Sequence, residues 1–195
     1  MLRLRPVTLA RSSLVPARLA AALLLSLGGA LPAFADTAPQ PLPFAQDWSS
    51  NVLTTADDWN GVPGVQGFLG QDITTSTGAN PQLLTGTSTL ANDVDILVNQ
   101  SNPNALATGG GAEFDSLPNP CVALNGSAVA DAPSLVVHLD TRGMSQVKVE
   151  YTLRDLDGRS DNAVQPLALQ YRVGSSGAFK NVPEAFVADA TTGPS

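Results

Sequence analysis

Short apolar runs separated by turn-forming residues dominate the chain after residue 43. The separators are Gly, Pro, Asn, Asp, Ser and Thr, and no segment of this region keeps an apolar period of 3.6 residues over three helical turns. Apolar runs of strand length that are bounded by turn residues are typical of β-sandwiches and β-barrels. The pattern therefore predicts an all-β fold.

The clearest predicted strands lie in the last third of the chain. Ser134–Asp140 follows Pro133 and ends before a turn at Gly143. Gln146–Asp155 and Gln165–Val173 carry apolar residues at every second position, which predicts one buried and one solvated face. The side chains expected to face the core are Val147, Val149, Tyr151, Leu153, Leu167, Leu169, Tyr171 and Val173.

Further strands and one hairpin complete the prediction. Gly174–Gly177 is a turn signal, and Phe179–Val182 after it predicts a hairpin with the preceding strand. Weaker strand candidates are Phe44–Trp48, Val65–Leu69, Val94–Val98, Ala112–Phe114 and Cys121–Leu124. Together these segments predict an antiparallel, jelly-roll-like β-sandwich over residues 44–195.

The N-terminus has the pattern of a cleavable signal peptide over residues 1–35. Four arginines and no acidic residue precede the apolar run Leu19–Leu31, which is 13 residues long and too short to span a bilayer comfortably. The small-x-small site Ala33–Ala35 follows, so cleavage is expected after Ala35. We therefore expect a secreted, extracellular protein, exported through the Sec route, that meets the membrane only during export. Residues 36–43 form a Pro-rich leader, expected to be extended and mobile.

Removal of the signal peptide makes the chain strongly acidic. Residues 36–195 contain all seventeen acidic residues but only six basic ones, a formal net charge of −11 against −7 for the whole chain. Such a charge repels nucleic-acid phosphates, so no nucleic-acid contact is expected. Cys121 is the single cysteine and His138 the single histidine, and both are interpreted as structural residues.

One acidic cluster suggests a metal site. Asp155, Asp157, Asp161 and Asn162 place three carboxylates and an amide within eight residues, with Gly158 among them. Ca²⁺ prefers such oxygen ligands, which makes this cluster a candidate calcium site, although the spacing is not that of an EF-hand. An Asx-rich turn whose side chains bond their own backbone fits the same residues.

Aromatic side chains offer a second kind of chemistry. Trp48, Trp59, Phe68, Tyr151 and Tyr171 are available for stacking on sugars, and Trp59 lies in a loop-like stretch beside Asp57 and Asp58. Because aromatic residues make up only 5% of the chain, we expect most of them to be needed in the core. No G-x-S-x-G motif or other catalytic motif is present in the sequence.

Four stretches resemble a known kind of module. They are DDWNGVPGVQGFLGQD (57–72), GGGAEF (109–114), VALNGSAVADAPSLVVHLDTRG (122–143) and residues 147–195. Together they resemble the N-terminal β-sandwich module of large secreted bacterial proteins, some of which carry lamin-tail-like and extracellular endonuclease/exonuclease/phosphatase domains further on. In that family the sandwich continues for several more strands, so the resemblance implies that this module is incomplete at its C-terminus. It carries no catalytic residue over to this sequence.

Three functional hypotheses follow. The favoured one is a non-catalytic secreted module for adhesion or for contact with a cell-surface or extracellular glycan. The alternative is the N-terminal fragment of an extracellular nuclease or phosphoesterase whose catalytic domain lies downstream. A small independent hydrolase is the third, and nothing in the sequence selects its catalytic residues.

Overall fold

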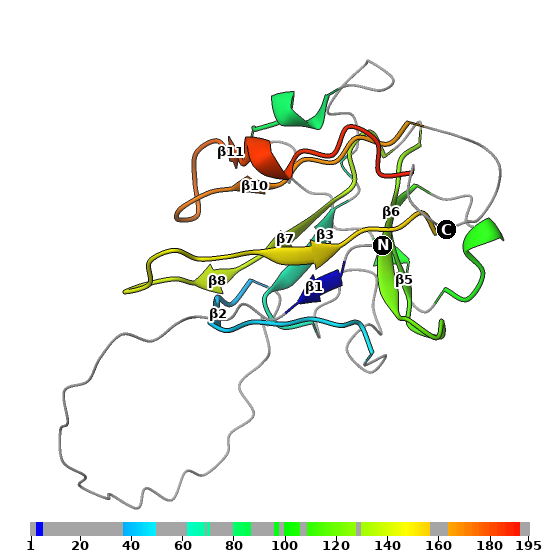
Figure 1. The fold of residues 1–195 in the computed structure, drawn as a ribbon, viewed down its shortest axis with the longest axis horizontal. Coiled ribbons are helices and arrows are strands. Elements are labelled where there is room, and N and C mark those ends of the chain that lie inside the picture. Colours follow the sequence, from blue (N-terminus) through cyan, green and yellow to red (C-terminus); the bar gives the residue numbers. More distant parts are fainter. Residues whose placement is uncertain are drawn as a thin grey trace, which may run out of the picture.

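The computed structural model consists of short strands joined by turns (Figure 1). It describes residues 3–5, 37–49, 62–68, 70, 80–86, 96–97, 100–105, 109–127, 130–156 and 164–191. The strands are β1 (Arg3–Arg5), β2 (Gln40–Pro41), β3 (Val65–Phe68), β4 (Ile96–Leu97), β5 (Gly110–Phe114), β6 (Cys121–Asn125), β7 (Ser134–Val137), β8 (Leu139–Asp140), β9 (Glu150–Thr152), β10 (Gln170–Tyr171) and β11 (Lys180–Asn181). Three short 3₁₀ helices, η2 (Pro81–Leu83), η4 (Pro103–Ala105) and η5 (Pro183–Ala185), accompany them, and the described ranges contain no α-helix. The all-β prediction is confirmed.

Two small sheets hold the centre of the molecule. β3 and β7 pair antiparallel with Val65 opposite Val137, while β4, β5 and β6 form a three-stranded sheet in that order. Within this second sheet, β5 and β6 pair antiparallel along five residues, with Phe114 opposite Cys121. These strands form where short apolar runs lie between turns rich in Gly and Pro.

Two strand pairs depart from the predicted antiparallel arrangement. β2 runs parallel to β8, and β4 runs parallel to β5. A parallel pair needs a crossover of about a dozen residues or more, and residues 98–109 supply that length between β4 and β5. The prediction of an entirely antiparallel sheet is therefore wrong for these two pairs.

The main core lies between the two sheets. Buried Trp48, Val62, Val65 and Val122 form it, and Phe44, Leu124, Leu135 and Val137 pack against them. Val65, Leu135 and Val137 come from β3 and β7, whereas Val122 and Leu124 come from β6, so the two sheets share this core. A second cluster covers the opposite face of β5 and β6, where Ala112, Phe114 and Cys121 are buried with Leu117, Ala123 and Leu156 around them.

The expected signal peptide and the Pro-rich leader each contribute one strand. β1 lies within the expected signal peptide and pairs antiparallel with β9, so this pairing belongs to the uncleaved chain. β2 lies within the Pro-rich leader, where the Gln40 amide donates to the carbonyl of His138 at 2.9 Å. The leader is therefore attached to the sheet region at this point.

Two glycines adopt nearly the same left-handed backbone in different surroundings. Gly70 has a φ of +70°, and its carbonyl accepts hydrogen bonds from the amides of Asp131 and Ala132. Gly143 has a φ of +72° at the turn after β8, with open space around its α-carbon. Gly70 is thus fixed against a neighbouring backbone, whereas Gly143 serves an exposed turn.

The strand predictions hold best near the core. Ser134–Asp140 forms β7 and β8 with a break at His138, and four of the weaker candidates contain or overlap β3, β4, β5 and β6. Gln146–Asp155 contributes only the three residues of β9, and Val147 and Val149 are 38% and 42% exposed. The prediction that these two valines face the core is wrong, because residues 141–149 lie in an exposed arm.

Candidate functional site

The β10–β11 hairpin is the predicted hairpin and forms the most distinctive exposed feature of the fold. Gln170 lies opposite Asn181, and Tyr171 lies opposite Lys180. Residues 173–177 make the turn, in which Gly174 and Gly177 both adopt positive φ. Because opposite residues of an antiparallel pair share a face, Tyr171 and Lys180 lie on one face and the two amides on the other.

The amide face fixes the hairpin to the segment 80–86. The Gln170 side chain donates to Asn181 Oδ1 at 2.9 Å and to the carbonyl of Pro81 at 3.1 Å. The Asn181 side chain donates to the carbonyl of Gln82 at 2.8 Å. These bonds use the side-chain NH₂ groups of both residues and two carbonyls of η2, so the hairpin is held in a defined orientation.

Two further contacts stiffen the hairpin near its turn. The guanidinium of Arg172 lies 4.5 Å from the centre of the Phe179 ring, within cation–π range. The backbone amide of Phe179 donates to the carbonyl of Thr85 at 2.8 Å, a second link to the segment 80–86. Arg172 therefore keeps its charge close to the hairpin and does not extend freely into solvent.

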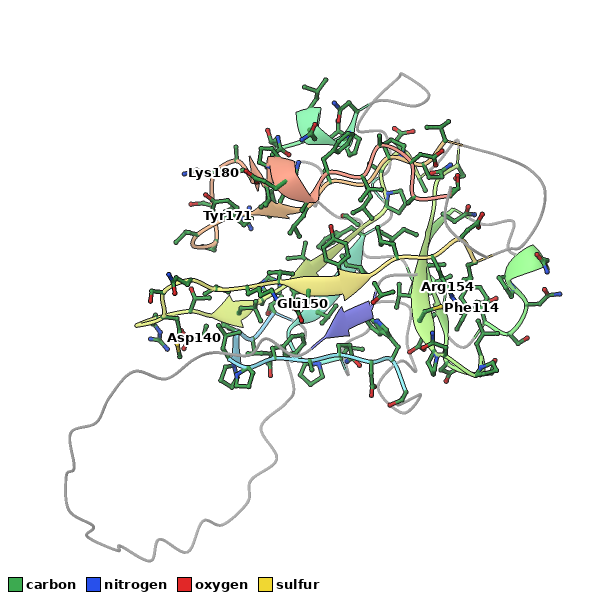
Figure 2. All side chains as sticks on the ribbon, in the orientation of Figure 1. Phe114, Asp140, Glu150, Arg154, Tyr171 and Lys180 are labelled. Carbon is green, nitrogen blue, oxygen red and sulfur yellow. The ribbon has the colours of Figure 1, made fainter. Side chains whose placement is uncertain are left out.

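The opposite, outer face of the hairpin is open to solvent. Tyr171 is 50% exposed, Val173 is 88% exposed, and Lys180 is exposed between the turn and η5. Figure 2 shows Tyr171 and Lys180 on the hairpin, on the side of the molecule away from Phe114 and Arg154. The prediction that Tyr171 and Val173 face the core is therefore wrong: the hairpin extends past the packed sheets.

This outer face combines an aromatic ring, an apolar side chain and an ammonium group. A tyrosine ring has an apolar face and a hydroxyl that donates and accepts hydrogen bonds. The apolar C–H face of a sugar ring can pack on such a surface while its hydroxyls bond to polar groups at the edge. Aromatic residues are enriched in recognition surfaces for this combination of properties.

The candidate calcium cluster lies only in part within the described residues. Asp155 is half-buried after β9, whereas Asp157, Asp161 and Asn162 lie outside the described ranges. In the part of the chain that the structure describes, no three His, Cys, Asp or Glu side chains gather as they would around a metal ion. The calcium site therefore stays a prediction.

Cys121 and His138 have structural surroundings. Cys121 is buried at the start of β6, and the Arg154 guanidinium lies 4.0 Å from its sulfur. Burial raises the pKa of the thiol, and the nearby Arg154 opposes this effect only in part. His138 Nε2 is hydrogen bonded to the Gln66 side chain at 2.9 Å, which links β3 to the break between β7 and β8.

The other aromatic candidates are less open to a ligand or lie outside the described residues. Trp48 and Phe68 are buried, as expected for core residues. The Tyr151 hydroxyl donates to the carbonyl of Ala185 at 3.1 Å, and burial raises the pKa of this tyrosine. Trp59 lies outside the described residues. Tyr171 is thus the described candidate with the ring most open to a ligand.

Sequence reasoning missed one buried carboxyl group. Glu113 lies in β5 with an exposed fraction of 0%, opposite Val122 and on the face of the main core. Its neighbours Gly111, Ala112 and Phe114 in the sequence GGAEF indicate a buried strand, and this was the available signal. Glu113 also contributes to the raised pKa of Cys121.

Comparison with known proteins gives no relative for this chain. No protein-family model, no curated protein and no solved structure matches it. Among the residues described, no helix has both the length and the apolar character needed to cross a bilayer.

Proposed function

We propose that the chain is a secreted, non-catalytic β-module that contacts an extracellular glycan through the outer face of the β10–β11 hairpin. Export by the signal peptide at residues 1–35 and a jelly-roll-like arrangement of the two central sheets are part of this proposal. The shared core between β3–β7 and β5–β6 supports a layered sandwich.

The half-exposed ring of Tyr171 is the observation that carries the proposal. A tyrosine on a strand normally contributes its ring to the core, since burial of a large aromatic surface stabilises the fold. Here the hydrogen bonds made by the side chains of Gln170 and Asn181 hold the hairpin so that the ring faces solvent. A hairpin held in this way loses little backbone freedom when a ligand packs on the ring.

Binding of the full-length chain to an array of neutral and charged glycans tests the proposal. Each glycan that binds is then titrated by calorimetry against the wild-type chain, Tyr171→Ala and Tyr171→Phe. Loss of the ring is expected to weaken binding at least about tenfold, which corresponds to about 1.4 kcal/mol. Tyr171→Phe keeps the ring and is expected to retain most of the affinity.

Met144→Ala provides a matched control. Met144 is an exposed apolar residue on the separate arm after β8, so its loss is expected to leave the affinity unchanged. Thermal melts of every variant check that the fold is intact. The proposal fails if the wild-type chain binds no glycan on the array, or if Tyr171→Ala binds as tightly as the wild type.

A further inference from the structure

The hairpin region differs in charge from the rest of the molecule. Residues 164–183 contain Arg172 and Lys180 but no acidic residue, a formal charge of +2. The segment 80–86, on which the hairpin packs, also contains no acidic residue. By contrast, the chain from residue 36 onward has a formal net charge of −11. The next acidic residues along the chain are Glu184 in η5 and Asp189, whose carboxylate accepts a hydrogen bond from the Gln165 amide at 3.3 Å, at the end of this region away from the hairpin turn.

The basic side chains on the two exposed arms of the molecule, residues 140–150 and the β10–β11 hairpin, have different partners. On the arm around residues 140–150, Arg142 forms an ion pair with Asp140 at 2.6 Å, and Lys148 forms one with Glu150. On the hairpin, Lys180 makes no ion pair with any described residue, and Arg172 stacks on Phe179. Figure 1 shows both arms projecting toward the same side, so the difference is not one of position on the molecule.

Lys180 lies directly opposite Tyr171 on the outer face of the hairpin. Opposite residues of an antiparallel pair have their β-carbons about 5 Å apart, so one sugar residue packed on the ring places its substituents near the ammonium group. At physiological ionic strength the Debye length is about 8 Å, so the more distant carboxylates of the chain are largely screened at this point. A carboxylate or sulfate on the sugar would meet a local positive charge.

We infer that the ligand of this hairpin is an anionic glycan, one that carries uronic acid, sialic acid or sulfate groups. This inference rests on the proposed function, because the tyrosine ring supplies the contact with the sugar itself. Lys180 supplies the charge-assisted hydrogen bond to the acidic group. Arg172 adds positive potential from the edge of the hairpin.

The test compares one sugar backbone with and without its charge. Oligogalacturonate and its fully methyl-esterified form present the same ring to Tyr171, and only the first carries carboxylates. Sialylated and sulfated oligosaccharides extend the panel, and a single-stranded oligonucleotide is included as a non-glycan polyanion. EDTA is present throughout, so that calcium bridging does not contribute. We expect at least one anionic glycan to bind about tenfold or more tightly than its uncharged counterpart.

Two lysine variants separate this inference from the proposed function. Lys180→Gln is expected to remove the preference for the charged sugar and to leave weaker binding of the uncharged form. Lys148→Gln removes an exposed lysine that is paired with Glu150, and the preference is expected to remain. Rising salt is expected to weaken binding of the charged glycan in the wild type and to have little effect in Lys180→Gln.

Each outcome has a defined meaning. Equal binding of charged and uncharged sugars overturns the anionic assignment and leaves the glycan-binding proposal standing. An unchanged preference in Lys180→Gln overturns the assignment to this hairpin. Tighter binding of the oligonucleotide than of every glycan overturns the choice of ligand class. Absence of binding to the entire panel overturns both proposals.

Discussion

Replacement of Gly70 with alanine tests the close backbone approach between residues 70 and 132. A β-carbon at this position would lie 2.3 Å from the carbonyl oxygen of Ala132. This is far inside van der Waals contact, and the atom it meets belongs to the backbone. Gly143 is the matched control, because it has nearly the same φ and nothing within 4 Å of an added β-carbon.

The two substitutions share one energetic cost and differ in another. A left-handed backbone costs an alanine roughly 1–2 kcal/mol at either position. Only at Gly70 must the neighbouring backbone also move, and overpacking of this kind costs about 1–3 kcal/mol more. We therefore expect Gly70→Ala to lose about 1–3 kcal/mol more stability than Gly143→Ala. For a domain of this size each kcal/mol lowers Tm by about 2–4 °C.

Urea unfolding followed by tryptophan fluorescence measures both losses. Trp48 lies in the main core, so its emission reports on the loss of that core. The dependence of the unfolding free energy on urea concentration is also compared, because equal slopes show that both variants expose the same surface on unfolding. Equal losses of free energy, within about 0.5 kcal/mol, would refute the described approach of Gly70 to Ala132.

Three further predictions concern single groups. Hydrogen bonds from the Arg142 side chain and backbone lower the pKa of Asp140 to about 2. The stability that they give is present above the ordinary pKa of an aspartate, and it is lost as the pH falls from that ordinary pKa through the lowered one. Carbon-detected NMR titration should show this midpoint, and Arg142→Ala should raise it; an ordinary midpoint in the wild type contradicts the ion pair. Burial raises the pKa of Cys121, so alkylation by iodoacetamide should be slow in the native chain and fast in urea; equal rates would show that the thiol is accessible. N-terminal sequencing of the exported protein should begin at Asp36, and an intact Met1 would rule out cleavage.

Local sequence pattern predicted the strands that surround the core. The boundaries of the predicted strands Val65–Leu69, Ala112–Phe114 and Cys121–Leu124 agree with those of β3, β5 and β6 to within one or two residues. These segments are short, apolar and bounded by turn residues, so their local preference agrees with their burial. The prediction succeeded here because pattern and packing give the same answer.

The pattern failed where an apolar face has no sheet to cover it. Val147, Val149, Tyr171 and Val173 alternate as core residues do, yet all four are exposed. Alternation identifies a face of a strand, but only the pairing of distant segments decides whether that face is buried. The same limit explains why the parallel pairing of β2 with β8 was not predicted. The outward position of Tyr171, which carries the proposed function, could therefore be found only in the structure.

The pairing of β2 and β3 with β8 and β7 sets the order in which the sheets can assemble during synthesis. Both β2 and β3 have partners within residues 134–140, so they stay unpaired until that segment has been made. The pairs β5–β6 and β10–β11 differ from these, since their strands are close neighbours in the chain. Contacts so distant in sequence close slowly, and their strands are exposed to other chains in the meantime. The proposed export through the Sec route would require an unfolded chain, and slow closure of these distant pairs would keep the core residues apart until residues 134–140 are present.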